Sequence, residues 1–231
     1  MKRRSPWLTL FALIGGAAGS YYMAQAYQKA RAGCPPFRKR TLTSREQLLD
    51  AFGWVWRHPE ALRSLHENRE ITSALARKMA LAIAGANGNR YAGSTRMLAA
   101  LSQGLARDES ESLLRGELAY ATASEAPAIV YARRYAEQQG EPEADIVQQL
   151  AAQYGARTAQ DIITCVRLIT LASLVGNTFD ALVSRALGQP SATTTLAEEL
   201  AILLMFGFGM GPLVQVLAWR AARPLDAPTT L

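Results

Sequence analysis

An apolar run near the C-terminal end sets the strongest limit on how this chain folds. Residues 200–219 carry one polar side chain, Gln215, and are about as long as a helix that crosses a bilayer. Trp219 followed by Arg220 and Arg223 is typical of a membrane–water boundary. The run predicts a membrane-embedded helix over residues 198–222 and a short tail over 223–231. The alternative is a buried helix in an oligomer core, although the glycines and the proline of the run would weaken it there.

A second apolar run begins the chain. Three basic residues at positions 2–4 precede an apolar stretch over residues 7–26. Residues 1–30 are therefore interpreted as an uncleaved anchor or as a secretory signal cleaved after Ala24-Gln-Ala26, and the anchor is favoured. A soluble packing helix is the third possibility. A basic linker is predicted over residues 31–44.

The net charge of +6 points to a membrane surface rather than to nucleic acid. Basic residues cluster beside both apolar runs, where anionic lipid headgroups attract them, and no nucleic-acid recognition motif accompanies them. Membrane lipid is thus the expected partner, and a bacterial inner membrane the expected location. The basic residues at the two chain ends favour cytoplasmic termini with the central domain outside. Five basic residues between positions 29 and 40 oppose that orientation, so the side stays undecided with a slight lean outward.

The middle of the chain predicts an all-α fold. Alanine, leucine and arginine are frequent, strand-like alternation is scarce, and no flexible linker divides the region. One helical domain is therefore predicted over residues 45–190. Ser44 is the expected N-cap of its first helix, Pro127 and Pro142 suit the first turns of helices, and Gly104 and Gly155 suit helix ends.

Asn87-Gly88 and Tyr91 stand in a stretch that runs from Arg77 to Arg96. This stretch resembles the carboxymuconolactone decarboxylase and alkylhydroperoxidase D-like family, whose core helix pair carries an acid, an Asn-Gly-Cys-x-Tyr-Cys run and a His. Residues 117–137, 145–150 and 161–182 are similar to the family's following helices. The resemblance implies an alkylhydroperoxidase D-like helical bundle, with Asn87-Gly88 ending one core helix, and assembly into a homo-oligomer.

The chemical positions of that family are all replaced in this chain. The resemblance places the acid at Arg77, the two cysteines at Asn89 and Ala92, and the histidine at Arg96, while Tyr91 keeps its place. An amide or a methyl group is no redox nucleophile, and an arginine does not shuttle protons near neutral pH. Thiol peroxidase activity by the family mechanism is therefore not expected. The five residues remain as a degenerate active site or candidate pocket.

Signals for other enzyme classes are missing from the sequence. His58 and His66 belong to no group with metal-ligand spacing, no Gly-rich loop follows a strand, and no serine stands on a nucleophile elbow. Cys165 lies in an apolar helix and Cys34 beside two prolines, a pair too sparse for a disulfide framework. No metal, no cofactor and no catalytic residue are predicted.

Two hypotheses of different kinds follow. The first is a membrane-anchored, non-catalytic protein that serves as a structural or accessory subunit of a membrane assembly, or binds a small apolar molecule. A homo-oligomer or another membrane protein would then be its partner. The alternative is an enzyme of divergent chemistry, such as a decarboxylase, an isomerase or a hydroperoxide-related enzyme, that uses the Arg/Asn/Tyr pocket. That alternative needs a general base, for which Glu117 and Glu125 are the candidates.

Overall fold

The computed structural model describes residues 37–88, 104–186 and 188–210 of the chain. They form helices and connecting loops without a strand, which confirms the predicted all-α class. The helices are α2 (Arg45–Arg57), α3 (Pro59–Glu67), α4 (Ser73–Ala86), α6 (Arg107–Arg115), α7 (Ala126–Glu137), α8 (Ala144–Ala186) and α9 (Leu196–Leu204), and α9 continues into a π-helix, η1 (Met205–Met210). The predicted N-terminal anchor lies outside the described residues.

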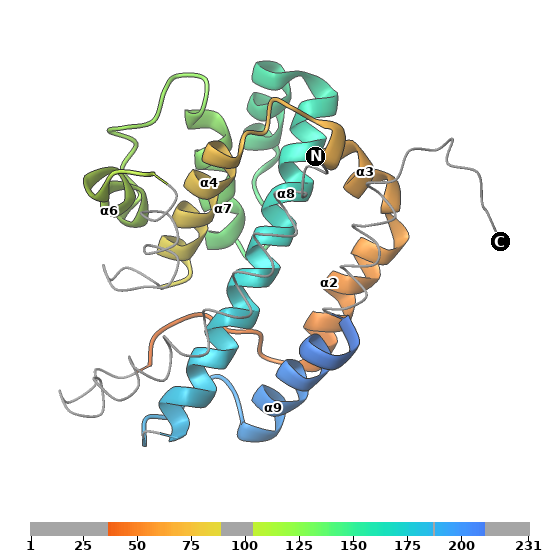
Figure 1. Ribbon diagram of the computed structural model, residues 1–231, viewed down its shortest axis with the longest axis vertical. Helices are drawn as coiled ribbons and strands as arrows, with labels where there is room; N and C mark the ends of the chain where they lie inside the picture. Colours follow the sequence, from red (N-terminus) through yellow and green to blue (C-terminus); the bar gives the residue numbers. More distant parts are fainter. Residues whose placement is uncertain (1–36, 89–103, 187, 211–231) are drawn as a thin grey trace, which may run out of the picture.

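Helix α8 is the axis of the molecule. It crosses the whole view in Figure 1, with α4, α6 and α7 on one side and α2, α3 and α9 on the other. Gly155 has non-helical dihedral angles, with φ of 77°, and kinks α8. The helix end predicted at Gly155 is therefore a kink between two helical stretches, through which the predicted helices 145–150 and 161–182 join into one element.

Two clusters of buried apolar residues pack around α8. The first core lies among α3, α4, α6, α7 and the N-terminal half of α8, and Met79, Leu81, Ile129 and Ile162 are among its fully buried members. The second core is much smaller. It consists of Leu42, Leu48, Phe52, Leu174, Val175 and Ile202. The Phe52 and Phe206 rings meet edge-to-face beside it, with centroids 6.1 Å apart.

Several predicted helix boundaries are confirmed. Ser44 caps α2 by accepting a hydrogen bond from the backbone N–H of Gln47, and Pro127 stands in the first turn of α7. Helix α4 ends at Ala86 with Asn87 as its C-cap, as the Asn-Gly pair predicts. Pro142, in contrast, precedes α8 instead of lying in its first turn. Gly104 lies in a turn with φ of 93°, but the helix that it was expected to end falls outside the described residues.

The prediction of one helix over residues 117–137 is wrong at its start. Gly116 adopts a left-handed conformation that ends α6, and α7 begins only at Ala126. Between them, the Glu125 carboxylate accepts hydrogen bonds from the backbone N–H and the hydroxyl of Thr122, at 3.1 and 2.9 Å. This local turn takes the place of two helical turns because it satisfies the polar groups before Pro127.

Among the described helices, α8 alone is long and apolar enough to cross a membrane by length and composition. The predicted C-terminal helix is described only as far as Met210, too short a stretch for the same test. Just over half of the most apolar window of α8, 56%, is buried against the other helices. A core helix of a soluble domain has the same property, so its apolar character by itself is only weak support for a membrane span.

Candidate functional site

Of the five predicted site residues, Arg77 alone lies in the described part of the chain. It stands half-buried near the start of α4. Asn89, Tyr91, Ala92 and Arg96 lie outside the described residues. What the structure does resolve is the place where this predicted site begins, the C-terminal end of α4.

Asn87 and Gly88 fit this place for packing reasons. Asn87 is buried, its side-chain amide donates to the Ser173 hydroxyl of α8 at 3.2 Å, and its carbonyl accepts the backbone N–H of Arg40 at 3.0 Å. Gly88 has φ of 89°, and a Cβ there would lie 3.0 Å from the carbonyl oxygen of Arg38. The Asn-Gly pair therefore ends α4 and lets the segment 37–42 pass closely beside it.

A row of polar side chains on α8 receives the segment 37–42. We call it the polar seam; it consists of Thr170, Ser173, Asn177, Thr178 and Asp180. The Asn177 amide donates to the carbonyl of Arg40 at 2.7 Å, the Thr178 hydroxyl accepts the backbone N–H of Leu42 at 3.2 Å, and Asp180 pairs with Lys39. These bonds satisfy the backbone of an extended segment that makes no sheet. The sequence reasoning missed the seam, although its spacing of three and four residues is visible.

Three buried polar atoms near the seam have no hydrogen-bond partner among the described residues. They are Asn87 Oδ1, Thr170 Oγ1 and Thr41 Oγ1. A buried unsatisfied polar atom costs on the order of 1–3 kcal/mol. Buried polar groups thus gather near the end of α4, at the point where the predicted site begins.

Lys78, the neighbour of Arg77, is held by two carboxylates. Its ammonium lies 2.9 Å from Glu109 of α6 and 2.9 Å from Glu125 at the start of α7. Burial acts against the charged form of Lys78, but the hydrogen bonds to Glu125 and Glu109 outweigh it, so its pKa is raised. Lys78 therefore stays charged and joins α4, α6 and α7.

Neither candidate general base has the properties of one. Burial favours the neutral form of Glu125, but the hydrogen bonds from Lys78 and Thr122 prevail and lower its pKa. Glu117 is exposed and paired with Arg115 at 2.9 Å, and the hydrogen bond from Arg115 lowers its pKa. A carboxylate with a lowered pKa is a weaker proton acceptor at neutral pH.

The described residues contain neither an accessible thiol nor a metal-binding group. Cys165 is a free cysteine, fully buried in α8, and burial raises the pKa of its thiol to about 12. No group of three or more His, Cys, Asp or Glu side chains in the described ranges is arranged to hold a metal ion. His58 caps the end of α2 and stacks on Trp54, with ring centroids 4.8 Å apart.

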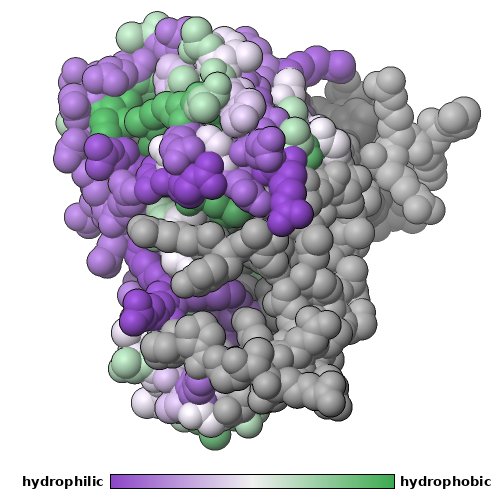
Figure 2. Space-filling view, turned by 90° about the vertical axis from the view of Figure 1, so that its left-hand side faces the viewer, coloured by the Kyte–Doolittle hydropathy of each residue, from purple (hydrophilic) through white to green (hydrophobic). Residues whose placement is uncertain are grey.

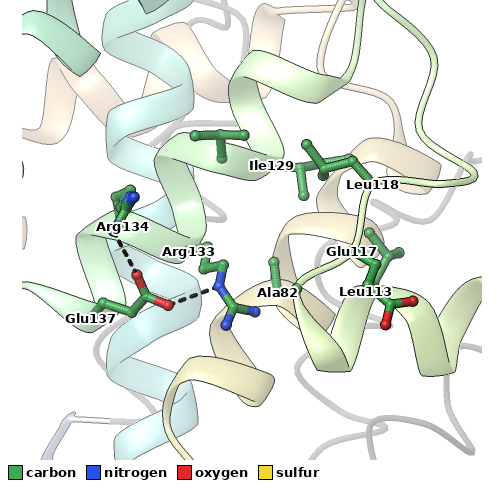
Figure 3. Close-up of a pocket in the computed structure, with 10 residues that line it drawn as sticks. Ala82, Leu113, Glu117, Leu118, Ile129, Arg133, Arg134 and Glu137 are labelled. Carbon is green, nitrogen blue, oxygen red and sulfur yellow. Dashed lines mark hydrogen bonds and ion pairs between the residues drawn. The ribbon is translucent and has the colours of Figure 1, made fainter.

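A pocket of about 260 Å³ opens between α4, α6 and α7 (Figure 3). Its apolar lining includes Ala82, Leu113, Leu118 and Ile129. Its charged lining comes from α7 and from Glu117 in the loop after α6. There the Arg133 Nε donates to Glu137 at 2.8 Å, and Arg134 reaches the same carboxylate at 3.3 Å.

The Arg133 guanidinium is incompletely paired. Its Nη1 is buried and has no hydrogen-bond partner among the residues that the structure describes. The group lies directly against Gly116, where a Cβ would stand 1.9 Å from Nη1. Only a glycine at position 116 leaves room for this guanidinium.

A second surface of interest lies on α9 and η1. Leu196, Leu200, Leu204 and Phe208 follow one another every four residues, and their exposed fractions are 48%, 41%, 55% and 84%. We call this row the α9 stripe. The other face of the helix is buried, with Ile202 in the second core and the fully buried Glu199 bound by Arg185 through two contacts of 2.9 Å.

The surface on the α6 side has a different character. In Figure 2 hydrophilic side chains predominate there, and apolar surface shows in a smaller patch among them. The exposed apolar residues Leu118 and Tyr120 belong to the loop between α6 and α7.

No known protein family, no curated protein and no solved structure matches this chain.

Proposed function

We propose that this chain is a membrane-associated, non-catalytic helical protein that serves as a structural or accessory subunit of a bacterial inner-membrane assembly. We further propose that it is a degenerate member of the carboxymuconolactone decarboxylase and alkylhydroperoxidase D-like family. The observation that carries the proposal is the α9 stripe, and the surface that it meets is the hydrocarbon region of the bilayer.

The two faces of α9 are buried and exposed, respectively, although both are apolar. A surface helix of a soluble protein has one apolar face and one polar face, whereas a helix that is apolar all round is buried or lies in a membrane. Ile202 and Phe206 pack toward the second core, yet Leu200, Leu204 and Phe208 on the other face are exposed. The exposed face therefore needs an apolar partner from outside the described fold.

The sequence beyond the described residues supports lipid as that partner. The run continues from Met210 to Trp219 with Gln215 as its only polar side chain, and Arg220 and Arg223 follow. Residues 200–219 together have the length of a bilayer span with a basic flank. The membrane orientation stays undecided, with a slight preference for a central domain outside the cytoplasm.

The proposal that the protein is non-catalytic is supported by the chemical properties of four side chains. The proposed resemblance would put Arg77 at the position of the family's acid. The Cys165 thiol is buried with a raised pKa, and Glu117 and Glu125 are ion-paired carboxylates with lowered pKa values. The alternative, an enzyme that uses Arg77, Asn89, Tyr91 and Arg96, gains no general base from the described residues.

The test is membrane retention of the full-length chain expressed in bacteria. We expect the protein to stay in the membrane pellet after alkaline carbonate washing and to float with liposomes of phosphatidylcholine and phosphatidylglycerol. The double variant Leu204→Glu/Phe208→Glu should be largely lost from both, because an acidic residue at the centre of a span costs roughly 3 kcal/mol. Tyr120→Glu is the control, since Tyr120 is 53% exposed, close to the 55% of Leu204, but belongs to the loop between α6 and α7.

Two results would contradict the proposal. Wild-type protein that carbonate releases completely would exclude a span. A double variant that changes from oligomer to monomer in size-exclusion chromatography, with no wild-type flotation, would assign the α9 stripe to a second copy of the chain. Mass spectrometry of the detergent-extracted protein would also show whether residues 1–26 are retained and whether another membrane protein is present in stoichiometric amount, as an accessory subunit requires.

A further inference from the structure

The pocket between α4, α6 and α7 has the form of a binding site for a small acid. Neither Arg77 nor any residue of the α9 stripe is among the described residues that line it, and nothing in the proposed function uses it. Its volume of about 260 Å³ lies just below the range of roughly 300–1,000 Å³ that is usual for drug-sized ligands. The ligand is therefore smaller than such a molecule.

The incompletely paired guanidinium of Arg133, which lines the pocket on a side chain that is 24% exposed, identifies the polar end of the ligand. Glu137 occupies the Nε edge of the guanidinium at 2.8 Å, while the buried Nη1 has no acceptor in the described part of the chain. In Figure 3 the guanidinium lies between Glu137 and Ala82. A guanidinium carries several N–H donors and no acceptor, so the missing partner is an oxygen acceptor, and a carboxylate oxygen is the strongest of these.

The charges around the pocket limit the ligand to one negative charge. Arg133 and Arg134 share the single carboxylate of Glu137, which leaves this wall with one uncompensated positive charge. Glu117 on the opposite wall is paired with Arg115 at 2.9 Å. A second negative charge on the ligand would approach Glu117 or Glu137 and be repelled, which disfavours phosphate and dicarboxylates.

The remaining walls of the pocket are apolar and favour a ligand with a hydrocarbon chain. Ala82, Leu113 and Ile129 are buried, and Leu118 and Val130 are partly exposed at the pocket. In Figure 3 Leu118 and Ile129 lie close together, away from the guanidinium. We propose that this pocket binds a small monocarboxylic acid, with its carboxylate on Arg133 and its short hydrocarbon chain against α4, α6 and α7.

Gly116 belongs to the same proposed binding site. Because a Cβ at this position would stand 1.9 Å from Arg133 Nη1 and 2.1 Å from Cζ, any side chain there displaces the guanidinium. The left-handed turn after α6 thus leaves room for the Arg133 guanidinium beside Gly116 in the pocket wall.

The test is ligand-observed NMR with pentanoate and the full-length protein in mild detergent, with protein-free micelles as blank. We expect saturable binding of pentanoate and much weaker binding of its neutral analogue pentanamide. Arg133→Met keeps the aliphatic stem and should weaken pentanoate binding about tenfold or more. Arg107→Met removes the same charge from an exposed side chain of α6 that is not among the lining residues, and should change binding less than about twofold.

Val130→Phe provides a second and independent test, because it fills the pocket without changing the charge. It should abolish pentanoate binding while the unfolding midpoint stays close to that of the wild type. The proposal is overturned if pentanoate shows no saturable binding, if pentanamide binds as tightly, or if either Arg133→Met or Val130→Phe binds like the wild type. None of these results depends on membrane retention, so the pocket and the α9 stripe are tested separately.

Discussion

The first core is enclosed by α3, α4, α6, α7 and α8, whereas the second core is closed on its outer side by α9 and η1. Around the first core the charged residues Lys78, Glu109 and Glu125 join the helices. Around the second core, the closing helix turns Leu200, Leu204 and Phe208 outward. The difference is that ion pairs join the helices around the first core, whereas the helix that closes the second core carries a continuous row of exposed apolar side chains.

The largest expected effect comes from truncating one buried isoleucine in each core. Ile162→Ala in the first core should lower the free energy of unfolding by about 3–5 kcal/mol, because enclosed surroundings do not collapse into the cavity. Ile202→Ala should cost closer to about 2 kcal/mol, because α9 is held by few helices and shifts toward the gap. Urea unfolding of the full-length protein in detergent, followed by circular dichroism, measures both. Equal losses would mean that the two cores are equally rigid.

A medium effect is expected where the segment 37–42 passes the C-terminal end of α4. Gly88→Ala adds a Cβ 3.0 Å from the Arg38 carbonyl oxygen at a φ of 89°, whereas Gly104→Ala adds one at a φ of 93° with no atom within 4 Å. Both variants lose roughly 1–2 kcal/mol to the left-handed backbone. Gly88→Ala should cost about 1 kcal/mol more, because the segment 37–42 must move. The difference between their unfolding midpoints isolates that contact, and identical midpoints would show that the segment gives way freely.

A smaller effect is expected from pH, through the anchor of α9. Burial favours the neutral form of Glu199, but the hydrogen bonds from Arg185 and Thr194 prevail, so its pKa in the folded protein is lowered. The stability that Glu199 contributes is therefore complete above the pKa of an unfolded glutamate, about 4.3, and is lost as the pH falls through the folded pKa. Thermal unfolding between pH 7 and pH 3 should show this loss. Glu199→Gln should weaken the pH dependence, and an unchanged slope would exclude Glu199 as its source.

The smallest effect is expected on the surface of the first region. Tyr120→Ser removes an exposed ring from the loop between α6 and α7 and should change the free energy of unfolding by less than about 0.5 kcal/mol. Phe208→Ser should be similarly mild for stability in detergent, yet it should reduce aggregation when the detergent is diluted, because it interrupts the α9 stripe. Light scattering after dilution separates the two variants. A larger gain in solubility from Tyr120→Ser would mean that the loop between α6 and α7, and not the α9 stripe, is the surface that causes aggregation.

The sequence predicts the elements of this fold better than their contacts. Local signals such as the Ser44 cap, Pro127 and the Asn87-Gly88 pair place helix boundaries correctly, because each acts within a few residues. The predicted helix start at residue 117 is wrong because the turn made by Thr122 and Glu125 competes locally and no periodicity reveals it.

The candidate sites depend on contacts that no local pattern contains. The bonds between the segment 37–42 and the polar seam join residues more than 130 positions apart in the sequence, and Arg133 becomes a pocket residue because Gly116 lies against it. From sequence alone, Arg133 is an ordinary arginine in an amphipathic helix. The α9 stripe is the exception, since the composition of residues 200–219 by itself indicates an apolar surface.

The segment 37–42, which leads into α2, and helix α9, which leads toward the C-terminus, are both bound to the C-terminal end of α8. The incoming segment is tied by Asn177, Thr178 and Asp180, and the outgoing helix α9 is tied through Arg185 and Glu199, only a few turns away. If membrane-bound ends pull on the molecule, the mechanical load passes between these ties through the last turns of α8. The pocket between α4, α6 and α7 lies outside that path. Tension from a moving membrane would therefore loosen the second core first and leave the pocket at rest.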